Sequence, residues 1–107
     1  MKTLSALIGA ATMSVAISAA ASAATVQVAQ QGRSFVPGEV TIHPGDVVQI
    51  SNKDEFIHQI YVDSTQMSFD SDEQPPGQSI SITFPKTGDF PVRCHIHPKM
   101  LLTVHVK

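Results

Sequence analysis

Apolar residues recur at every second position along most of the chain after Thr25, and this alternation constrains the fold more than any other feature. Every second side chain of a β-strand points to the same face, so the pattern predicts half-buried strands rather than helices. Gly, Pro, Asp or Ser residues separate the segments, as turns require. The positions that carry the pattern are Val26, Val28, Phe35, Val36, Val40, Ile42, Val48, Ile50, Ile60, Val62, Ile80, Ile82, Phe84, Phe90, Val92, Leu102, Val104 and Val106.

These segments predict an all-β domain with about seven to eight short strands and no convincing amphipathic helix. An antiparallel sandwich or barrel is the expected architecture. The alternation fades after Asp63, through a polar stretch that ends at Pro75-Pro76-Gly77. We expect a surface loop there, with a short helical turn around Ser64 to Met67.

The N-terminal segment has the layout of a secretory signal peptide. Lys2 precedes an apolar run from Leu4 to Ile17, and small residues follow up to Ala23. We therefore predict a signal peptide at 1–23, cleavage after Ala23 and a single domain at 24–107. A membrane anchor is the alternative, but the run is shorter than the ~20 apolar residues of a spanning helix. The prediction is an exported, periplasmic protein with no membrane span once the signal is removed.

Charge and cysteine content narrow the possible functions. The formal net charge is −2 and no basic cluster is present, which argues against a nucleic-acid partner. Cys94 is the single cysteine. Because an oxidising compartment threatens a lone thiol, we expect Cys94 to be protected or to have a chemical role.

The segment Cys94-His95-Ile96-His97-Pro98-Lys99-Met100 places a thiolate, an imidazole and a thioether three residues apart. Two His, one Cys and a weak distant Met form the trigonal sites that hold copper for electron transfer. The alternation selects the second imidazole, because His58 shares the inward face of Ile60 and Val62. The metal-ligand candidates are therefore His58, Cys94, His97 and Met100, whereas His43 and His105 alternate against their apolar neighbours and should face solvent.

Other interpretations of these residues remain open at this stage. Taken singly, a buried Cys or Met is ordinary core material, and a buried His can bond a backbone carbonyl. Zinc also accepts Cys and His, although it gains little from a thioether. Cys94 and His97 could instead be a nucleophile and base of an enzyme. A copper-trafficking or copper-storage protein is a further alternative, in which His95 would serve as another ligand.

From Phe35 to Val106 the chain resembles a small cupredoxin of the plastocyanin and amicyanin type. Phe35-x-Pro37-x-x-Val40-x-Ile42-x-x-Gly45-Asp46-x-Val48-x-Ile50-x-Asn52 resembles the family's strands before the first His ligand, and the Cys94 to Met100 segment is similar to amicyanin's ligand loop. The chain departs from the family at Gln59, where the family usually has Asn, at Leu102, where it tends to have Gly, and at Lys99, where it tends to have an apolar residue.

The resemblance implies a Greek-key β-sandwich with one type 1 copper held by His58, Cys94, His97 and Met100. It implies a monomeric electron carrier rather than an enzyme. The expected partners are redox proteins, with a periplasmic dehydrogenase as donor and a c-type cytochrome as acceptor.

Overall fold

The computed structural model describes residues 22–107. The regular elements in this part of the chain are all β-strands. The strands are β1 (Thr25–Gln30), β2 (Phe35–Val36), β3 (Glu39–Ile42), β4 (Val47–Asn52), β5 (Ile60–Asp63), β6 (Ser68–Asp70), β7 (Ser79–Thr83), β8 (Gly88–Cys94) and β9 (Leu101–Val106). The predicted signal peptide lies almost entirely outside the described residues. No helix within 22–107 has the length and apolar character of a membrane span.

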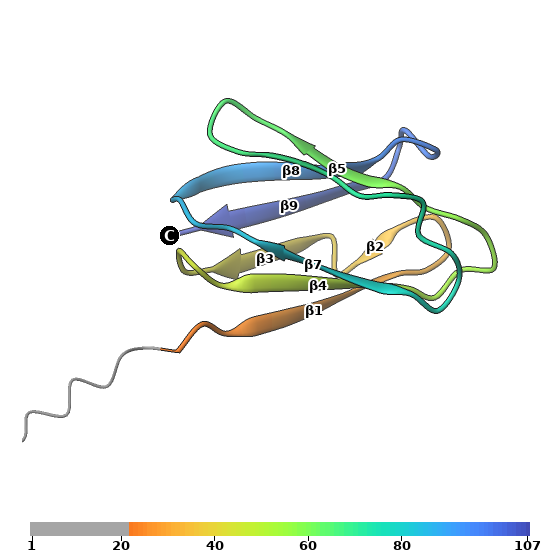
Figure 1. The fold of residues 1–107 in the computed structure, drawn as a ribbon, viewed down its shortest axis with the longest axis horizontal. Helices are drawn as coiled ribbons and strands as arrows, with labels where there is room; N and C mark the ends of the chain where they lie inside the picture. The colour runs from red at the N-terminus through yellow and green to blue at the C-terminus, as the bar shows by residue number, and fades with distance from the viewer. Residues whose placement is uncertain (1–21) are drawn as a thin grey trace, which may run out of the picture.

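The strands form two sheets that face each other (Figure 1). One sheet has the order β2-β1-β4-β7, and the other has the order β3-β9-β8-β5-β6. The apolar face of each sheet points toward the other sheet, and the side chains between the two sheets form one hydrophobic core. The predicted all-β sandwich is confirmed.

Two of the strand pairings are parallel, which alternation alone cannot indicate. β1 runs parallel to β4, with Val28 opposite Ile50, and β3 runs parallel to β9, with Val40 opposite Val104. The other pairings are antiparallel. The first and last strands of the domain are therefore both held by long-range contacts, since β1 joins β4 and β9 joins β3 and β8.

The polar stretch after Asp63 contains a strand that the sequence did not reveal. β6 pairs with β5 at the sheet edge, with Val62 opposite Phe69. The expected helical turn at 64–67 is wrong: Ser64 and Met67 close a tight turn, in which the Ser64 N–H donates to the Met67 carbonyl at 3.1 Å. The alternation does not predict β6, because this edge strand is three residues long and Phe69 is its single apolar residue.

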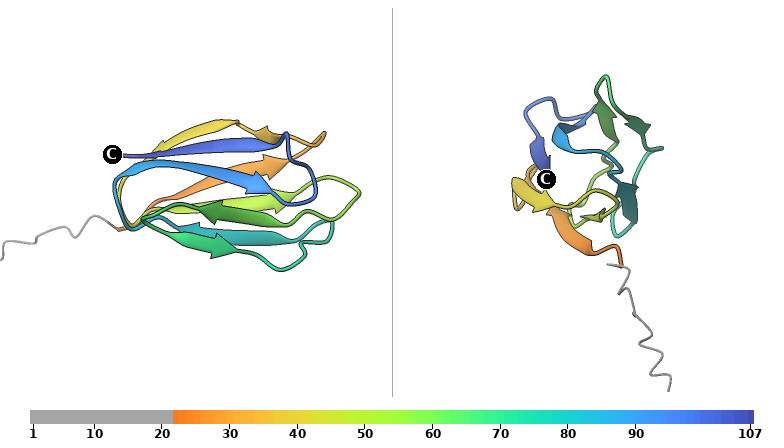
Figure 2. Two further views of the ribbon diagram at one scale, coloured as in Figure 1. Left: turned by 90° about the horizontal axis from the view of Figure 1, so that it is seen from above. Right: turned by 90° about the vertical axis from the view of Figure 1, so that its left-hand side faces the viewer.

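The loops that carry the predicted ligands lie together at one end of the sandwich. The β4–β5 and β8–β9 connections and the β1–β2 turn lie at the right in Figure 1, while the C-terminus and the β7–β8 turn lie at the left. The view from above in Figure 2 shows the same separation. The rigid sheets thus hold two segments that are distant in sequence, around His58 and after Cys94, at the same end.

Candidate metal centre

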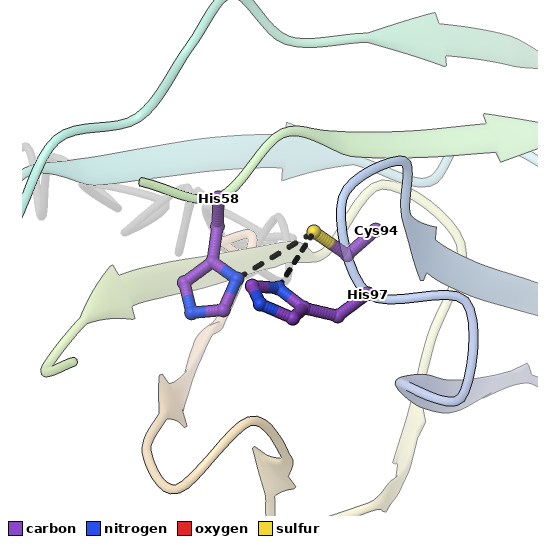
Figure 3. A group of neighbouring side chains, drawn as sticks. All are labelled: His58, Cys94 and His97. Atoms are coloured by element: carbon purple, nitrogen blue, oxygen red, sulfur yellow. Dashed lines mark hydrogen bonds between the residues drawn. The ribbon is translucent and has the colours of Figure 1, made fainter. Parts of the chain in front are cut away.

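Three of the four predicted ligands meet at this end of the sandwich. The Nδ1 atom of His58 lies 3.5 Å from the Cys94 sulfur, and the Nδ1 atom of His97 lies 3.9 Å from it. Figure 3 shows both imidazole rings turned toward the sulfur. The ligand atoms of the three residues all lie within 4.8 Å of one another. One ion can therefore contact all three donors.

The register of the five-stranded sheet explains why these residues converge. Ile60 of β5 is opposite Cys94 at the end of β8. His58 lies two residues before Ile60, on the same inward face, and pairs through its backbone with Gln74. His58 and Cys94 are both fully buried. The inward parity predicted for both residues is what the structure shows.

The ring of His58 is held in one orientation by Asp54. The Nε2 atom lies 2.8 Å from the Asp54 Oδ2 atom, and both side chains are almost completely buried. A carboxylate accepts hydrogen bonds, so Nε2 is the nitrogen that carries the proton toward Asp54, and Nδ1 faces the Cys94 sulfur. This is the tautomer that a metal ligand needs.

Asp54 also connects His58 to the β1–β2 turn. Its carboxylate accepts backbone N–H groups from Gly32 at 2.7 Å and from Arg33 at 3.2 Å. Burial tends to raise the pKa of Asp54, but the hydrogen bonds from His58, Gly32 and Arg33 outweigh it and lower the pKa below its ordinary value. Asn52 accepts the Asp54 N–H through its side chain. Asp54 is thus a charged acceptor in a fixed place.

The sulfur of Cys94 accepts a backbone hydrogen bond. The Gln59 N–H lies 3.4 Å from it, and the Gln59 carbonyl accepts the His95 N–H at 2.9 Å. The backbone of Gln59 therefore ties the two ligand-bearing segments together. Its side chain bonds elsewhere, to the Ser71 carbonyl at 3.2 Å. With Gln59 in place of the family's usual Asn, the link between the two ligand-bearing segments is made by the backbone of this residue.

Met100 is buried at the end of the same loop. Only 2% of it is exposed, and its N–H donates to the His97 carbonyl at 3.0 Å. It lines the same surface depression as His97. Leu102, the second departure, is fully buried in the core opposite Val92. The structure therefore places Met100 beside the His97 loop, with its side chain withdrawn from solvent.

His97 is the one candidate of the four that reaches the surface. It is half-buried, whereas the other three are buried. Burial lowers the pKa of His97, and the nearby His58 and Arg33 lower it further. Phe56 contacts both imidazoles, with ring centroids 5.2 Å from His58 and 5.1 Å from His97. Neutral His97 thus lies between the buried thiol and the outside.

The remaining histidines lie away from the three donors. His95 stacks on Tyr61, with ring centroids 3.9 Å apart, and its Nε2 atom lies 3.2 Å from Asp70. His95 is therefore exposed and does not join the three donors. His43 is exposed, and His105 is partly exposed on the outer face of its sheet.

Sequence reasoning missed Asp54 and Phe56. Both lie just before His58, in a loop whose course alternation does not define. An acidic residue four positions before a predicted His ligand was the available signal, since ligating imidazoles usually donate their other N–H to a carboxylate or carbonyl.

The donor set fits copper. A thiolate is soft, imidazoles are borderline, and a thioether adds a weak soft donor, which together suit an ion that cycles between Cu(I) and Cu(II). A structural zinc site would more often carry a fourth Cys, His or carboxylate. Within residues 22–107, no Asp or Glu joins the cluster of His58, Cys94 and His97.

Comparison with known proteins gives the same result. Residues 21–107 match the model of "copper binding proteins, plastocyanin/azurin family". A search of curated proteins finds no match. Amicyanin from Paracoccus versutus is 26% identical in sequence, with a TM-score of 0.70, over 81% of this chain and 83% of that one. A reduced amicyanin mutant is 21% identical, with a TM-score of 0.72, over 78% and 82% of the two chains.

A copper-containing nitrite reductase (NirK) from Thermus scotoductus SA-01 is also similar. It is 30% identical, with a TM-score of 0.70, over 78% of this chain. The match spans only 22% of the length of that enzyme. The family match over residues 21–107, the two-sheet fold and the donor set agree. The chain belongs to the plastocyanin/azurin family of copper-binding proteins, as a cupredoxin of the amicyanin and plastocyanin type whose cofactor is one type 1 copper.

Proposed function

We propose that this protein is a periplasmic electron carrier that passes single electrons between redox proteins. Its copper would be held by His58, Cys94, His97 and Met100, and supplies a one-electron couple between Cu(I) and Cu(II) when bound. The observation that supports this proposal most strongly is the convergence of both Nδ1 atoms on the Cys94 sulfur.

The protein's own part is to keep the ligands still and dry. Asp54 fixes the His58 ring, and the Gln59 N–H fixes the Cys94 sulfur. Preorganised ligands need little rearrangement when the charge of the site changes. The apolar interior behind Cys94 excludes water, since Val92 and Phe90 of the same strand are buried.

His97 gives this site its access to partners. Among the four proposed ligands only His97 has appreciable exposure, so a redox partner would approach the centre across its ring. The partners we propose are a dehydrogenase as electron donor and a c-type cytochrome as acceptor. In this reading the chain is a carrier and not an enzyme, and the nitrite reductase activity belongs to a much longer protein.

The test is spectroscopic and electrochemical. We expect the purified protein with one equivalent of Cu(II) to show an intense blue thiolate band, the EPR signature of type 1 copper and a reversible one-electron wave. Replacing Cys94→Ser should abolish the blue band. Replacing the half-buried Met67→Leu, in the β5–β6 turn, should leave it unchanged. A colourless protein that binds only Cu(I) would contradict the carrier proposal and favour copper trafficking.

Export is part of the same proposal. We propose removal of residues 1–23, which would leave Ala24 as the first residue. Expression of the full chain in a Gram-negative host, fractionation and intact-mass measurement test this. A periplasmic product that begins at Ala24 supports export, and an uncleaved product in the cytoplasm contradicts it.

A further inference from the structure

We infer that the surface around His97 docks a redox protein whose own docking face is apolar at the centre and rimmed by carboxylates. This inference rests on the proposed electron-carrier function and adds the chemistry of the partner. We call this surface the His97 face. It is lined by Arg33, Ile96, His97, Pro98, Lys99 and Met100.

The His97 face is an open depression with a volume of about 400 Å³. Ile96 and Pro98 supply its exposed apolar surface, with Ile96 46% exposed, and the buried Met100 lies at its base. Exposed apolar side chains that gather at one place usually mark a contact surface. The ring of His97 lies within this apolar area, so a partner that covers it would exclude water next to the proposed ligand.

The most exposed apolar side chains of the domain lie close in sequence to Arg33 or to the proposed ligands. Within residues 22–107, the large hydrophobic side chains with the greatest exposure are Val36, Ile57, Ile96 and Leu101. Each lies within three residues of Arg33 or of a proposed ligand in the sequence. Of these four residues, Ile96 lines the His97 face itself, and an exposed apolar side chain there is what a protein interface requires.

The charged residues that line the His97 face are both cations, Arg33 and Lys99. The chain as a whole has a formal net charge of −2. The exposed carboxylates Asp72 and Glu73 do not line this face, and neither does Glu55. The charged side chains that line this face are therefore opposite in sign to the net charge of the whole protein, and the nearby carboxylate of Asp54 is almost completely buried. A partner with carboxylates at its rim would be attracted to this end in particular.

Arg33 is held in place before any partner arrives. The Arg33 guanidinium lies over the Phe56 ring, 5.3 Å from the centroid, and the Arg33 backbone N–H donates to Asp54. Its φ of 57° places the turn in the left-handed region, which fixes the backbone there. A cation that is already ordered loses less entropy on binding a carboxylate. Phe56 also contacts His97, so the cation has a defined position relative to the proposed ligand.

A protein fits this face better than a small anion. A free anion would use Arg33 and Lys99 but would leave the apolar centre open to water. Small interfaces with an apolar core and a charged rim are typical of weak, fast redox encounters. The combination of features therefore indicates a protein face with the complementary arrangement.

The first test measures electron exchange with two c-type cytochromes, one with carboxylates and one with lysines around its haem edge. At low ionic strength we expect faster exchange with the carboxylate-rimmed cytochrome. Lys99→Glu should slow that reaction by about threefold to tenfold. Lys86→Glu makes the same charge change in the β7–β8 turn at the opposite end, and should change the rate by less than about twofold. Arg33→Gln should act like Lys99→Glu.

The second test does not depend on electron transfer. NMR spectra of the reduced protein would be recorded with hexacyanochromate(III), a paramagnetic anion that does not react, and with hexaamminechromium(III), the matching cation. We expect the anion to broaden amide signals at 31–34 and 96–100, and the cation to broaden signals at 70–73. The blue band of Lys99→Glu should match that of the native protein, which shows that the site is intact.

The outcomes separate this inference from the function on which it rests. Equal rates with both cytochromes, or equal effects of Lys99→Glu and Lys86→Glu, would overturn the inference while a reversible redox wave still supported the carrier. Anion broadening in a protein without a blue band would contradict the carrier alone. Sedimentation of the protein with phosphatidylglycerol vesicles, prevented by Lys99→Glu, would assign the face to a lipid surface and overturn the protein partner.

Discussion

At the scale of single residues, Asp54 links two parts of the chain that the proposed function uses together. One carboxylate accepts the His58 ring N–H and the backbone N–H groups of Gly32 and Arg33. The first contact sets the orientation of a proposed ligand, and the others set the backbone of the turn that carries Arg33. A single buried charge thus serves both the metal centre and the His97 face.

We expect Asp54→Asn to weaken copper binding by about 10- to 100-fold, the usual cost of losing the partner of a ligating imidazole. The neutral amide keeps one acceptor oxygen, which cannot serve His58 and both backbone groups equally well. Competition with a copper chelator of known affinity would measure the change. Asp72→Asn, which alters an exposed carboxylate, is the matched control. Equal affinities of the two variants would show that Asp54 does not position His58.

At the scale of elements, the alternation was sufficient to predict the strands that line the core. It was sufficient because each of them buries one face, so every second residue is apolar. β6 was missed because it is an edge strand that buries little apolar surface. The parallel pairings were missed because the alternation of apolar residues shows which face of a strand is buried and not in which direction its neighbour runs. His58 and Cys94 were placed correctly for the same reason that the core was. Asp54 lies in a loop, where no periodicity applies.

The outer face of the five-stranded sheet carries a cluster across three strands that is sensitive to pH. His105 of β9 lies 2.5 Å from a Glu39 oxygen of β3 and 2.6 Å from an Asp89 oxygen of β8. Hydrogen bonds to Glu39 and then to Asp89 raise the pKa of His105 above its ordinary value of 6.5. A raised pKa means that the folded state binds the proton more tightly than the unfolded state does.

This cluster should stabilise the fold fully below about pH 6.5, and the contribution should be lost as the pH rises through the higher folded-state pKa of His105. Urea unfolding of the native protein and of His105→Gln at a series of pH values measures it. We expect the native protein to exceed the variant in stability by a small margin at low pH, since the groups are exposed, and by less at high pH. A margin that is constant with pH would rule out His105 as the source.

The start of β1 offers a second prediction at this scale. The Ala24 N–H donates to the Asp46 Oδ1 atom at 2.9 Å, and the Ala24 carbonyl accepts the Val47 N–H. The proposed cleavage after Ala23 would turn that amide into an ammonium group beside a carboxylate. Asp46→Asn should therefore lower the melting temperature more in a chain that begins at Ala24 than in one that begins at Ser22. Equal losses in the two chains would show that the new charge has no effect there.

At the scale of the whole molecule, the two ends of the sandwich differ in kind. One end holds the β7–β8 turn, the C-terminus and the start of β1, which hydrogen bonds and strand pairing secure. The other end holds three polar side chains, His58, Cys94 and His97, gathered where the core meets solvent. A buried imidazole and thiol contribute less to stability than apolar residues of the same size would. These side chains thus lower the stability of the fold at this end, and a bound metal would offset that loss.

Copper should therefore stabilise the folded protein, because ligands drawn from the β4–β5 connection and from the β8–β9 loop are assembled only in the native state. At a thousandfold excess of free copper over its dissociation constant, the free energy of unfolding should rise by about 4 kcal/mol. Anaerobic thermal unfolding of the reduced protein, with and without Cu(I), measures this rise. Cys94→Ser keeps the size of the side chain and removes the thiolate, so most of the gain should disappear. Identical melting curves with and without copper, or an undiminished gain in Cys94→Ser, would show that the fold does not assemble this site.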